Sequence, residues 1–391
     1  MVRRAAARKA AGAARMTADG LAALVAEVRL LIQSARHATA TAVDTLQVFT
    51  NFQIGRRIVE HEQKGEKRAE YGQELLKTLS ARLAKEFGKG FSARNLRSFR
   101  AFFLTYQQRG SEIWQQPTAK FLPEKSLQQL AGQLTSLQIW QQPTAKSSNP
   151  FFLSWTHYVL LLTLKDPDER SFYEIEATRG GWSVPELKRQ VASCLYERLA
   201  LSRKKGEVRK LAAEGQIISR PEDLLKEPYV LEFLGLDERA RYSESDLEQA
   251  IIDRIERFLL ELGKGFLFES RQKRFTFDED HFFVDLVFYN RLLHCYVLID
   301  LKLEKLTHQD LGQMQMYVSY FDRYVKLPEE NPTLGIVLCK RKKDAIVELT
   351  LPKDANIHAR EYKLYLPSKE LLKKKLLEWT QESEQDAGAL P

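Results

Sequence analysis

The chain has 391 residues, of which 44% are hydrophobic and 29% charged, an ordinary globular mixture that supplies cores for about two domains. Its 60 Lys and Arg outnumber its 52 Asp and Glu, and this formal net charge of +8 permits a nucleic-acid partner without requiring one. No apolar run approaches the roughly 20 residues that span a bilayer. The three widely spaced cysteines fit a reducing cytosol better than a disulfide framework, so we expect a cytoplasmic protein with no membrane partner.

The chain begins with a basic stretch and continues with helical periodicity. Residues 1–17, "MVRRAAARKAAGAARMT", are expected to form a disordered basic arm. Apolar residues then recur at spacings of three and four in "LAALVAEVRLLI" and "LLKTLSARLAKEF", which indicates helices. We therefore expect a mainly α-helical N-terminal domain over residues 18–215.

One helix of this domain has two contrasting faces. In "FSARNLRSFRAFF", Ser92 can cap the helix that follows, and the apolar residues can face a core. Arg94, Arg97 and Arg100 recur every three residues and form a basic stripe. This pattern is typical of the recognition helix of a helix-turn-helix, which would bind DNA. A solvated basic face is an equally good interpretation.

Residues 108–149 contain a duplication. The octapeptide "IWQQPTAK" occurs at 113–120 and again at 139–146. Two copies are too few for a solenoid, which needs at least three. We expect a tandem duplication within a flexible surface insert of the N-terminal domain.

A second domain is expected after a linker at residues 216–228, which contains two prolines. Over residues 229–372 the patterns predict the order α-β-β-β-α-β-β, which is a hairpin-built α/β sheet surrounded by helices. The tail, residues 373–391, is expected to be a helical end that frays.

Three charged residues interrupt the apolar strands "VDLVFYN" and "LIDLKL". Asp300 and Lys302 are two apart and point to the same side of their strand, whereas the residues between and around them can face a core. Asp285 lies between two apolar residues and is expected to point away from an apolar face. If the hairpin turns near residues 290–293, Asp285 pairs close to Leu298, and the three charges converge.

Two adjacent carboxylates repel each other, and a divalent cation removes the conflict. Mg²⁺ (or Mn²⁺) is held in many sites by one or two carboxylates together with substrate phosphates. A neighbouring lysine can hold the attacking water or stabilise charge on the phosphate. Two carboxylates and a lysine on adjacent strands therefore predict metal-dependent phosphodiester cleavage. The alternative is an ion pair on a solvated face, since D-x-K alone arises often by chance.

These residues resemble the core of PD-(D/E)xK nucleases, with Asp285 as the first acid and Asp300-x-Lys302 as the second. Gln313 and Tyr317, four apart on one helix face, are similar to the Gln-x-x-x-Tyr element of some members. "FFVDLVFYNRLLHCYVLIDLKL", "GQMQMYVSYFD" and "NPTLGIVLCKRK" together resemble the C-terminal domain of the YhcG family, and "FSARNLRSFRAFF" and "GWSVPELKRQ" its helical N-terminal domain. The resemblance implies a restriction-endonuclease-like fold and nuclease activity on no established substrate.

The sequence departs from the family in two ways. Asp300 stands where the family usually has Glu, and the shorter side chain must draw a metal closer to the strand. The duplicated insert also looks peculiar to this chain. A helix acid often completes such sites; Glu248 and Glu261 are both candidates, and an ordinary exposed carboxylate is an equal alternative for each.

The leading functional hypothesis is a Mg²⁺-dependent endodeoxyribonuclease whose helical domain binds DNA. Asp285 and Asp300 would hold the metal, Lys302 would position water or stabilise the transition state, and Gln313 and Tyr317 would orient the substrate or the lysine. The alternative is a catalytically idle nuclease fold that binds DNA or forms complexes. The sequence does not separate DNA from RNA, and a homodimer is expected because many nucleases of this kind pair to cut both strands.

Overall fold

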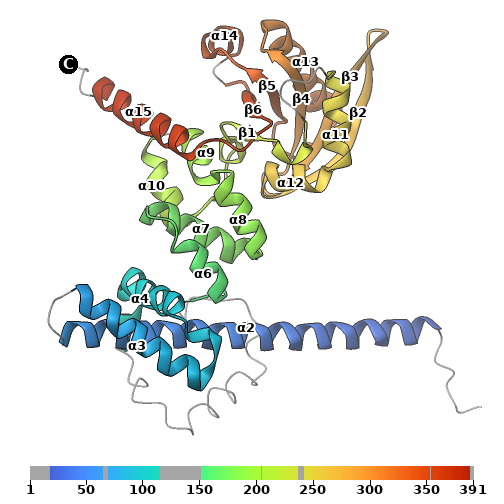
Figure 1. Cartoon of the computed structure of the whole chain (residues 1–391). Helices are drawn as coiled ribbons and strands as arrows, with labels where there is room; N and C mark the ends of the chain where they lie inside the picture. Colours follow the sequence, from blue (N-terminus) through green and yellow to red (C-terminus); the bar gives the residue numbers. More distant parts are fainter. Residues whose placement is uncertain are drawn as a thin grey trace, which may run out of the picture. The chain divides into compact units, whose positions relative to one another are not determined.

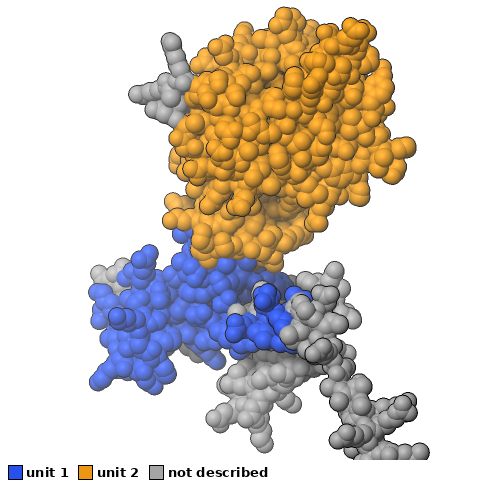
Figure 2. All heavy atoms as spheres, turned by 90° about the vertical axis from the view of Figure 1, so that its right-hand side faces the viewer, with its two compact units in different colours: residues 1–163 blue, residues 164–391 orange. Residues whose placement is uncertain are grey.

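The computed structural model describes residues 18–64, 69–114, 151–203, 205–236, 242–352 and 354–387. They form two compact units that divide between Thr163 and Leu164 (Figures 1 and 2). The expected basic arm and most of the duplicated insert lie outside the described residues. No described helix has the length and apolar character needed to cross a membrane.

Unit 1 is helical, as the periodicity predicts. Its helices are α2 (Ala18–Lys64), α3 (Ala69–Phe87), α4 (Ala93–Trp114) and α6 (Trp155–Leu161), with a 3₁₀ turn at Lys89–Phe91. An aromatic core joins α2, α4 and α6, in which Phe102 packs edge-to-face on Phe52. Gly55 permits the close crossing of α2 and α4, because a Cβ at this position would meet the carbonyl of Phe99.

Unit 2 combines a helical layer with a sheet domain. The first helices are α7 (Pro167–Gly180), α8 (Val184–Ala192), α9 (Leu195–Leu201) and α10 (Lys205–Glu214). The sheet domain contains β1 (Tyr229–Val230), α11 (Glu244–Asp253), α12 (Ile255–Leu262), β2 (Phe266–Phe277), β3 (Asp280–Asn290), β4 (Cys295–Lys305), α13 (His308–Tyr324), β5 (Leu334–Arg341), α14 (Asp344–Thr350), β6 (Ile357–Lys363) and α15 (Lys369–Ala387). The predicted order α-β-β-β-α-β-β is confirmed except that its first helix is divided at Arg254 into α11 and α12, and the short β1 and the helices α14 and α15 are additions to it.

The sheet has the order β1-β6-β5-β4-β3-β2 (Figure 1). Strands β2, β3 and β4 form an antiparallel meander, and β4, β5, β6 and β1 run parallel. Residues of α11 and α12 pack with one set of strand residues, which includes Val297, Ile299 and Leu301. Residues of α13 pack with another set, which includes Leu298 and Val337. The mixed sheet is therefore covered on both faces, and β4 lies near its middle.

The residues expected to form a linker are packed in unit 2. Leu224 and Leu225 are fully buried, and the Lys226 ammonium donates to the main-chain carbonyl of Glu261. The expected tail lies largely within α15, where Leu372 is buried and Lys369 pairs with Glu169 of α7. These contacts join the first helices of unit 2 to its sheet domain. The three cysteines are free and buried.

Candidate active site

The site lies where β3 and β4 meet. The two strands pair from Leu286 with Ile299 to Asn290 with Cys295. Continued by one step, this register would place Asp285 opposite Asp300 rather than near Leu298 as the sequence suggested, and the Asp285 charge does act on the Asp300 carboxylate. There the Asp285 Oδ2 atom accepts a hydrogen bond from the main-chain amide of Leu301 at 2.9 Å.

Asp300 and Lys302 form an ion pair, as their spacing predicts. The Lys302 Nζ atom lies 2.9 Å from Asp300 Oδ2 and 3.7 Å from an oxygen of Glu244. Asp300 is only 3% exposed, whereas Glu244, at the start of α11, is exposed. The pair is therefore not a solvated surface pair, and Glu244 is an additional anion at the site that sequence reasoning missed.

Burial and the neighbouring Asp285 carboxylate raise the pKa of Asp300 to about 7. Burial acts to lower the pKa of Lys302, but the Asp300 carboxylate outweighs it and raises that pKa above its ordinary value. Lys302 is therefore a permanent cation and hydrogen-bond donor at neutral pH. A lysine in this form can orient neighbouring groups and stabilise negative charge.

The strand alternation is reset at Asp285. The sequence predicts that Val284 and Leu286, two apart, share one apolar face. In the structure Val284 packs in the cluster of α13, whereas Leu286 packs in the cluster of α11 and α12. The irregularity has a counterpart on β2, where Gln272 has a φ of +45°. The alternation of side chains between the two faces of β3 is therefore interrupted at Asp285, which is one of the candidate site residues.

Glu248 of α11 joins this region. Its carboxylate is buried and lies 3.0 Å from the Nε atom of Arg271. It also accepts a hydrogen bond from the side-chain amide of Gln272. The same Gln272 amide donates to Asp285 Oδ1 at 3.0 Å. Sequence reasoning missed Gln272. Counting outward from the β2–β3 turn pairs it with Asp285, and that is the signal that could have found it.

Glu261 is not part of this cluster. It is fully buried, and its carboxylate is bound by the Arg198 guanidinium and by the Val230 amide at 2.9 Å. Burial acts to raise the pKa of Glu261, but Arg198 holds it below its usual range. The groups that donate to its carboxylate come from α9 and β1. Glu261 therefore stabilises the packing of unit 2, and these contacts do not orient it toward Asp285.

Gln313 and Tyr317 lie on one face of α13, as predicted. The Gln313 amide donates to the Tyr317 hydroxyl at 2.7 Å. Burial and the negative charges of Asp300 and Asp285 raise the pKa of Tyr317 to about 12. The charges of both carboxylates therefore act on the Tyr317 hydroxyl, which remains neutral at physiological pH.

Asp285 and Asp300 fit a divalent cation by their chemistry. Within the described ranges no group of three or more His, Cys, Asp or Glu side chains is arranged to hold a metal ion. Two adjacent carboxylates suffice for a cation that takes its remaining ligands from substrate phosphate and water. Burial and then the Asp285 charge raise the pKa of Asp300, and a bound cation would favour the ionised form against both.

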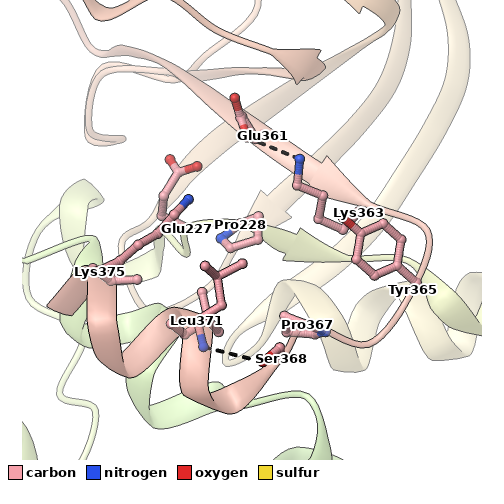
Figure 3. Close-up of a pocket in the computed structure, with 11 residues that line it drawn as sticks. Glu227, Pro228, Glu361, Lys363, Tyr365, Pro367, Ser368, Leu371 and Lys375 are labelled. Atoms are coloured by element: carbon pink, nitrogen blue, oxygen red, sulfur yellow. Dashed lines mark hydrogen bonds and ion pairs between the residues drawn. The ribbon is translucent and has the colours of Figure 1, made fainter.

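The hollow shown in Figure 3 is separate from this site. It has a volume of about 170 Å³ and is lined by residues of β6 and α15, among them Glu361, Lys363 and Leu371 (Figure 3). None of the charged residues at the β3–β4 site lines it.

The basic stripe lies on α4 of unit 1. The Ser92 hydroxyl accepts from the Asn95 amide, so the predicted cap forms, and Leu96, on the opposite face, is buried. Arg94 and Arg97 are exposed. Arg100 is half-buried, and its Nε atom lies 2.7 Å from Glu62 of α2. The stripe therefore presents two outward arginines and a third that is partly neutralised.

Solved structures resemble part of the chain only weakly. A repair endonuclease from Pyrococcus abyssi has a TM-score of 0.22 and 20% identity, and covers 33% of this chain and 50% of its own. A complex of EndoMS with double-stranded DNA has a TM-score of 0.24 and 15% identity, and covers 34% of this chain and 51% of its own. The chain spans about half the length of each of these proteins.

The sequence relationships are much closer. "Putative nuclease YhcG" of Escherichia coli (strain K12) is 42% identical over 348 residues, which are 89% of this chain and 91% of the relative. Residues 222–377 match the YhcG PDDEXK nuclease domain, and residues 27–198 match the DUF1016 N-terminal domain. The C-terminal domain thus has the PD-(D/E)xK fold predicted above, and the chain belongs to the YhcG family.

Proposed function

We propose that the protein is a divalent-metal-dependent endonuclease that hydrolyses phosphodiester bonds in DNA. One observation supports this most strongly. Asp285 of β3 lies close enough to Asp300 of β4 for its charge to act on that carboxylate, and the Lys302 ammonium lies 2.9 Å from Asp300, within a domain of a nuclease family. A buried ion pair of this kind costs desolvation energy, and a purely structural site gains little from a second carboxylate beside it.

Asp285 and Asp300 would hold the cation, Mg²⁺ or Mn²⁺, which nucleases of this type generally use. When bound, the cation offsets charge on the scissile phosphate and lowers the pKa of a water ligand. Lys302, a cation at neutral pH, would orient the attacking water and stabilise the negative charge that develops on the phosphate. Gln313 and Tyr317 form one hydrogen-bonded unit that would orient the substrate or Lys302.

The α4 stripe would supply DNA binding in unit 1. Arg94 and Arg97 are exposed and can reach phosphates, whereas Arg100 would first have to exchange its ion pair with Glu62. Phosphate contacts of this kind position a protein on DNA without reading its sequence. A homodimer would bring two sites to the two strands of a duplex.

The direct test is cleavage of supercoiled, linear, branched and single-stranded DNA, and of RNA, in Mg²⁺ or EDTA. We expect cutting in Mg²⁺, none in EDTA, and none by Asp300→Ala, while DNA binding is retained. The matched control is Asp344→Ala, which removes an exposed aspartate that pairs with Lys342.

Cleavage that survives in Asp300→Ala would contradict the assignment of the site. Binding of the substrates without cutting would favour the alternative of a catalytically idle nuclease fold. The residue that would explain such a loss is Asp300, whose side chain is shorter than the Glu that the family usually has at this position. Preference for RNA would leave the chemistry intact and correct the substrate.

A further inference from the structure

Gln272, in the middle of β2, has the left-handed φ of +45°. Residues with a side chain seldom adopt this conformation, and in a strand it interrupts the pleat. Such an outlier costs folding free energy and persists only where surrounding contacts enforce it. The contacts of Gln272 and of the residues beside it therefore indicate the role of this left-handed conformation.

The conformation brings two consecutive side chains to one carboxylate. In a regular strand Arg271 and Gln272 would point to opposite faces. Here the Arg271 Nε atom lies 3.0 Å from Glu248 Oε1, and the Gln272 amide donates to Glu248 Oε2. The left-handed residue thus turns β2 toward α11 at this one position.

Gln272 also holds the first acid of the site. The ladder pairs Arg271 with Leu286 and Lys273 with Val284, and between these pairs Gln272 and Asp285 are joined by a side chain. The Gln272 Nε2 atom donates to Asp285 Oδ1 at 3.0 Å, while Asp285 Oδ2 accepts from the Leu301 amide at 2.9 Å. Both oxygens of Asp285 are therefore fixed, one from β2 and one from β4.

We propose that Gln272 is a positioning residue of the nuclease site, whose amide bridges Asp285 and Glu248 and sets the Asp285 carboxylate in the orientation that holds the cation. This role rests on the proposed function. Gln272 itself would touch neither the substrate nor the metal. A donor behind a ligating carboxylate restricts its rotation, and such outer partners contribute substantially to metal affinity.

The test is calorimetric titration with Mn²⁺ alone, in the absence of DNA. Gln272→Gly removes the amide and suits the left-handed backbone, so the fold and Tm should be retained. Gln272→Asn also tolerates this backbone but is one methylene shorter and cannot bridge both carboxylates. We expect both variants to bind Mn²⁺ about 10-fold to 100-fold more weakly than the wild type.

The control is Thr276→Ala on the same strand, whose hydroxyl is bonded to His281 and not to the site. It should bind Mn²⁺ like the wild type. Cleavage by Gln272→Gly should recover as Mn²⁺ is raised, because the defect lies in cation binding rather than in the fold.

Equal Mn²⁺ affinity of the wild type and Gln272→Gly would overturn the positioning role while leaving the proposed function in place. Failure of the wild type itself to bind Mn²⁺ would overturn the metal-dependent function and, with it, the positioning role. The titration of the wild type therefore tests the metal-dependent function, and the comparison of Gln272→Gly with the wild type tests the positioning role.

Discussion

At the scale of single residues, the proposed chemistry depends on a carboxylate pair that is costly in the absence of a cation. Asp300 is almost fully buried beside Asp285, and Lys302 compensates only part of the negative charge. The sequence predicted that these three residues converge, because strand alternation and hairpin geometry are local rules. It could not choose between Glu248 and Glu261, since the partner of each carboxylate comes from a distant segment.

The pH dependence of stability follows from Asp300. Its folded pKa of about 7 exceeds the ordinary aspartate value, so the folded state holds a proton that the unfolded state has lost. Its contribution to stability is therefore fully present below about pH 4 and is lost as the pH rises to about 7. In EDTA, we expect the Tm difference between Asp300→Asn and the wild type to grow over this range.

Added Mg²⁺ should reverse the loss, because it favours the ionised pair, and should raise the wild-type Tm more at pH 8 than at pH 5. Thermal scans with and without Mg²⁺ check both statements. A Tm difference between wild type and Asp300→Asn that is independent of pH would contradict the assigned pKa.

The buried pair of Arg198 and Glu261 predicts a separate effect on stability. Glu261→Ala leaves the fully buried Arg198 guanidinium uncompensated, which should cost about 3–5 kcal/mol in the free energy of unfolding. Urea unfolding measures this loss. Glu256→Ala, an exposed position on the same helix α12, should change stability by no more than about 0.5 kcal/mol. Equal effects of the two variants would refute a structural role for Glu261.

At the scale of elements, β2, β3 and β4 and helix α13 follow from the sequence, because hydrophobic period and turn residues determine them locally. Two features do not. The reset of alternation at Asp285 and the left-handed Gln272 lie where Arg271 and Gln272 contact Glu248 of α11, and no local pattern in β2 predicts them. The capped helix α4 was predictable down to Ser92, whereas the ion pair of Arg100 with Glu62 depends on how α2 packs.

The exposed arginines of α4 predict how DNA binding responds to salt. With the Asp300→Ala protein, which should bind without cutting, Arg94→Ala and Arg97→Ala should each reduce the slope of log Kobs against log salt by about 1, if each arginine meets one phosphate. Fluorescence anisotropy over a salt series measures the slope. Arg57→Ala, an exposed arginine of α2 beside Glu60, is the control and should leave the slope unchanged. Slopes that stay unchanged in both Arg94→Ala and Arg97→Ala would indicate a solvated basic face.

At the scale of the whole molecule, the chain joins a helical N-terminal region to a PD-(D/E)xK domain, as the sequence indicated and the family models confirm. The fold class was predictable because long periodic segments carry it. The burial of residues 216–228 was not, because proline-rich composition looks the same in a linker and in a packed segment. Leu224 and Leu225 are apolar, and only tertiary contacts show what they cover.

The central claim is that Asp285, Asp300 and Lys302 act together on a phosphodiester bond. Its most direct test is the single-turnover rate of cleavage by Lys302→Met in saturating Mg²⁺, on the substrate that the wild type cuts best. Methionine keeps an unbranched side chain and removes the charge. We predict a rate at least about 100-fold below that of the wild type, with DNA binding retained. A rate within about twofold of the wild type would contradict the claim, since loss of an essential charge-stabilising donor costs far more.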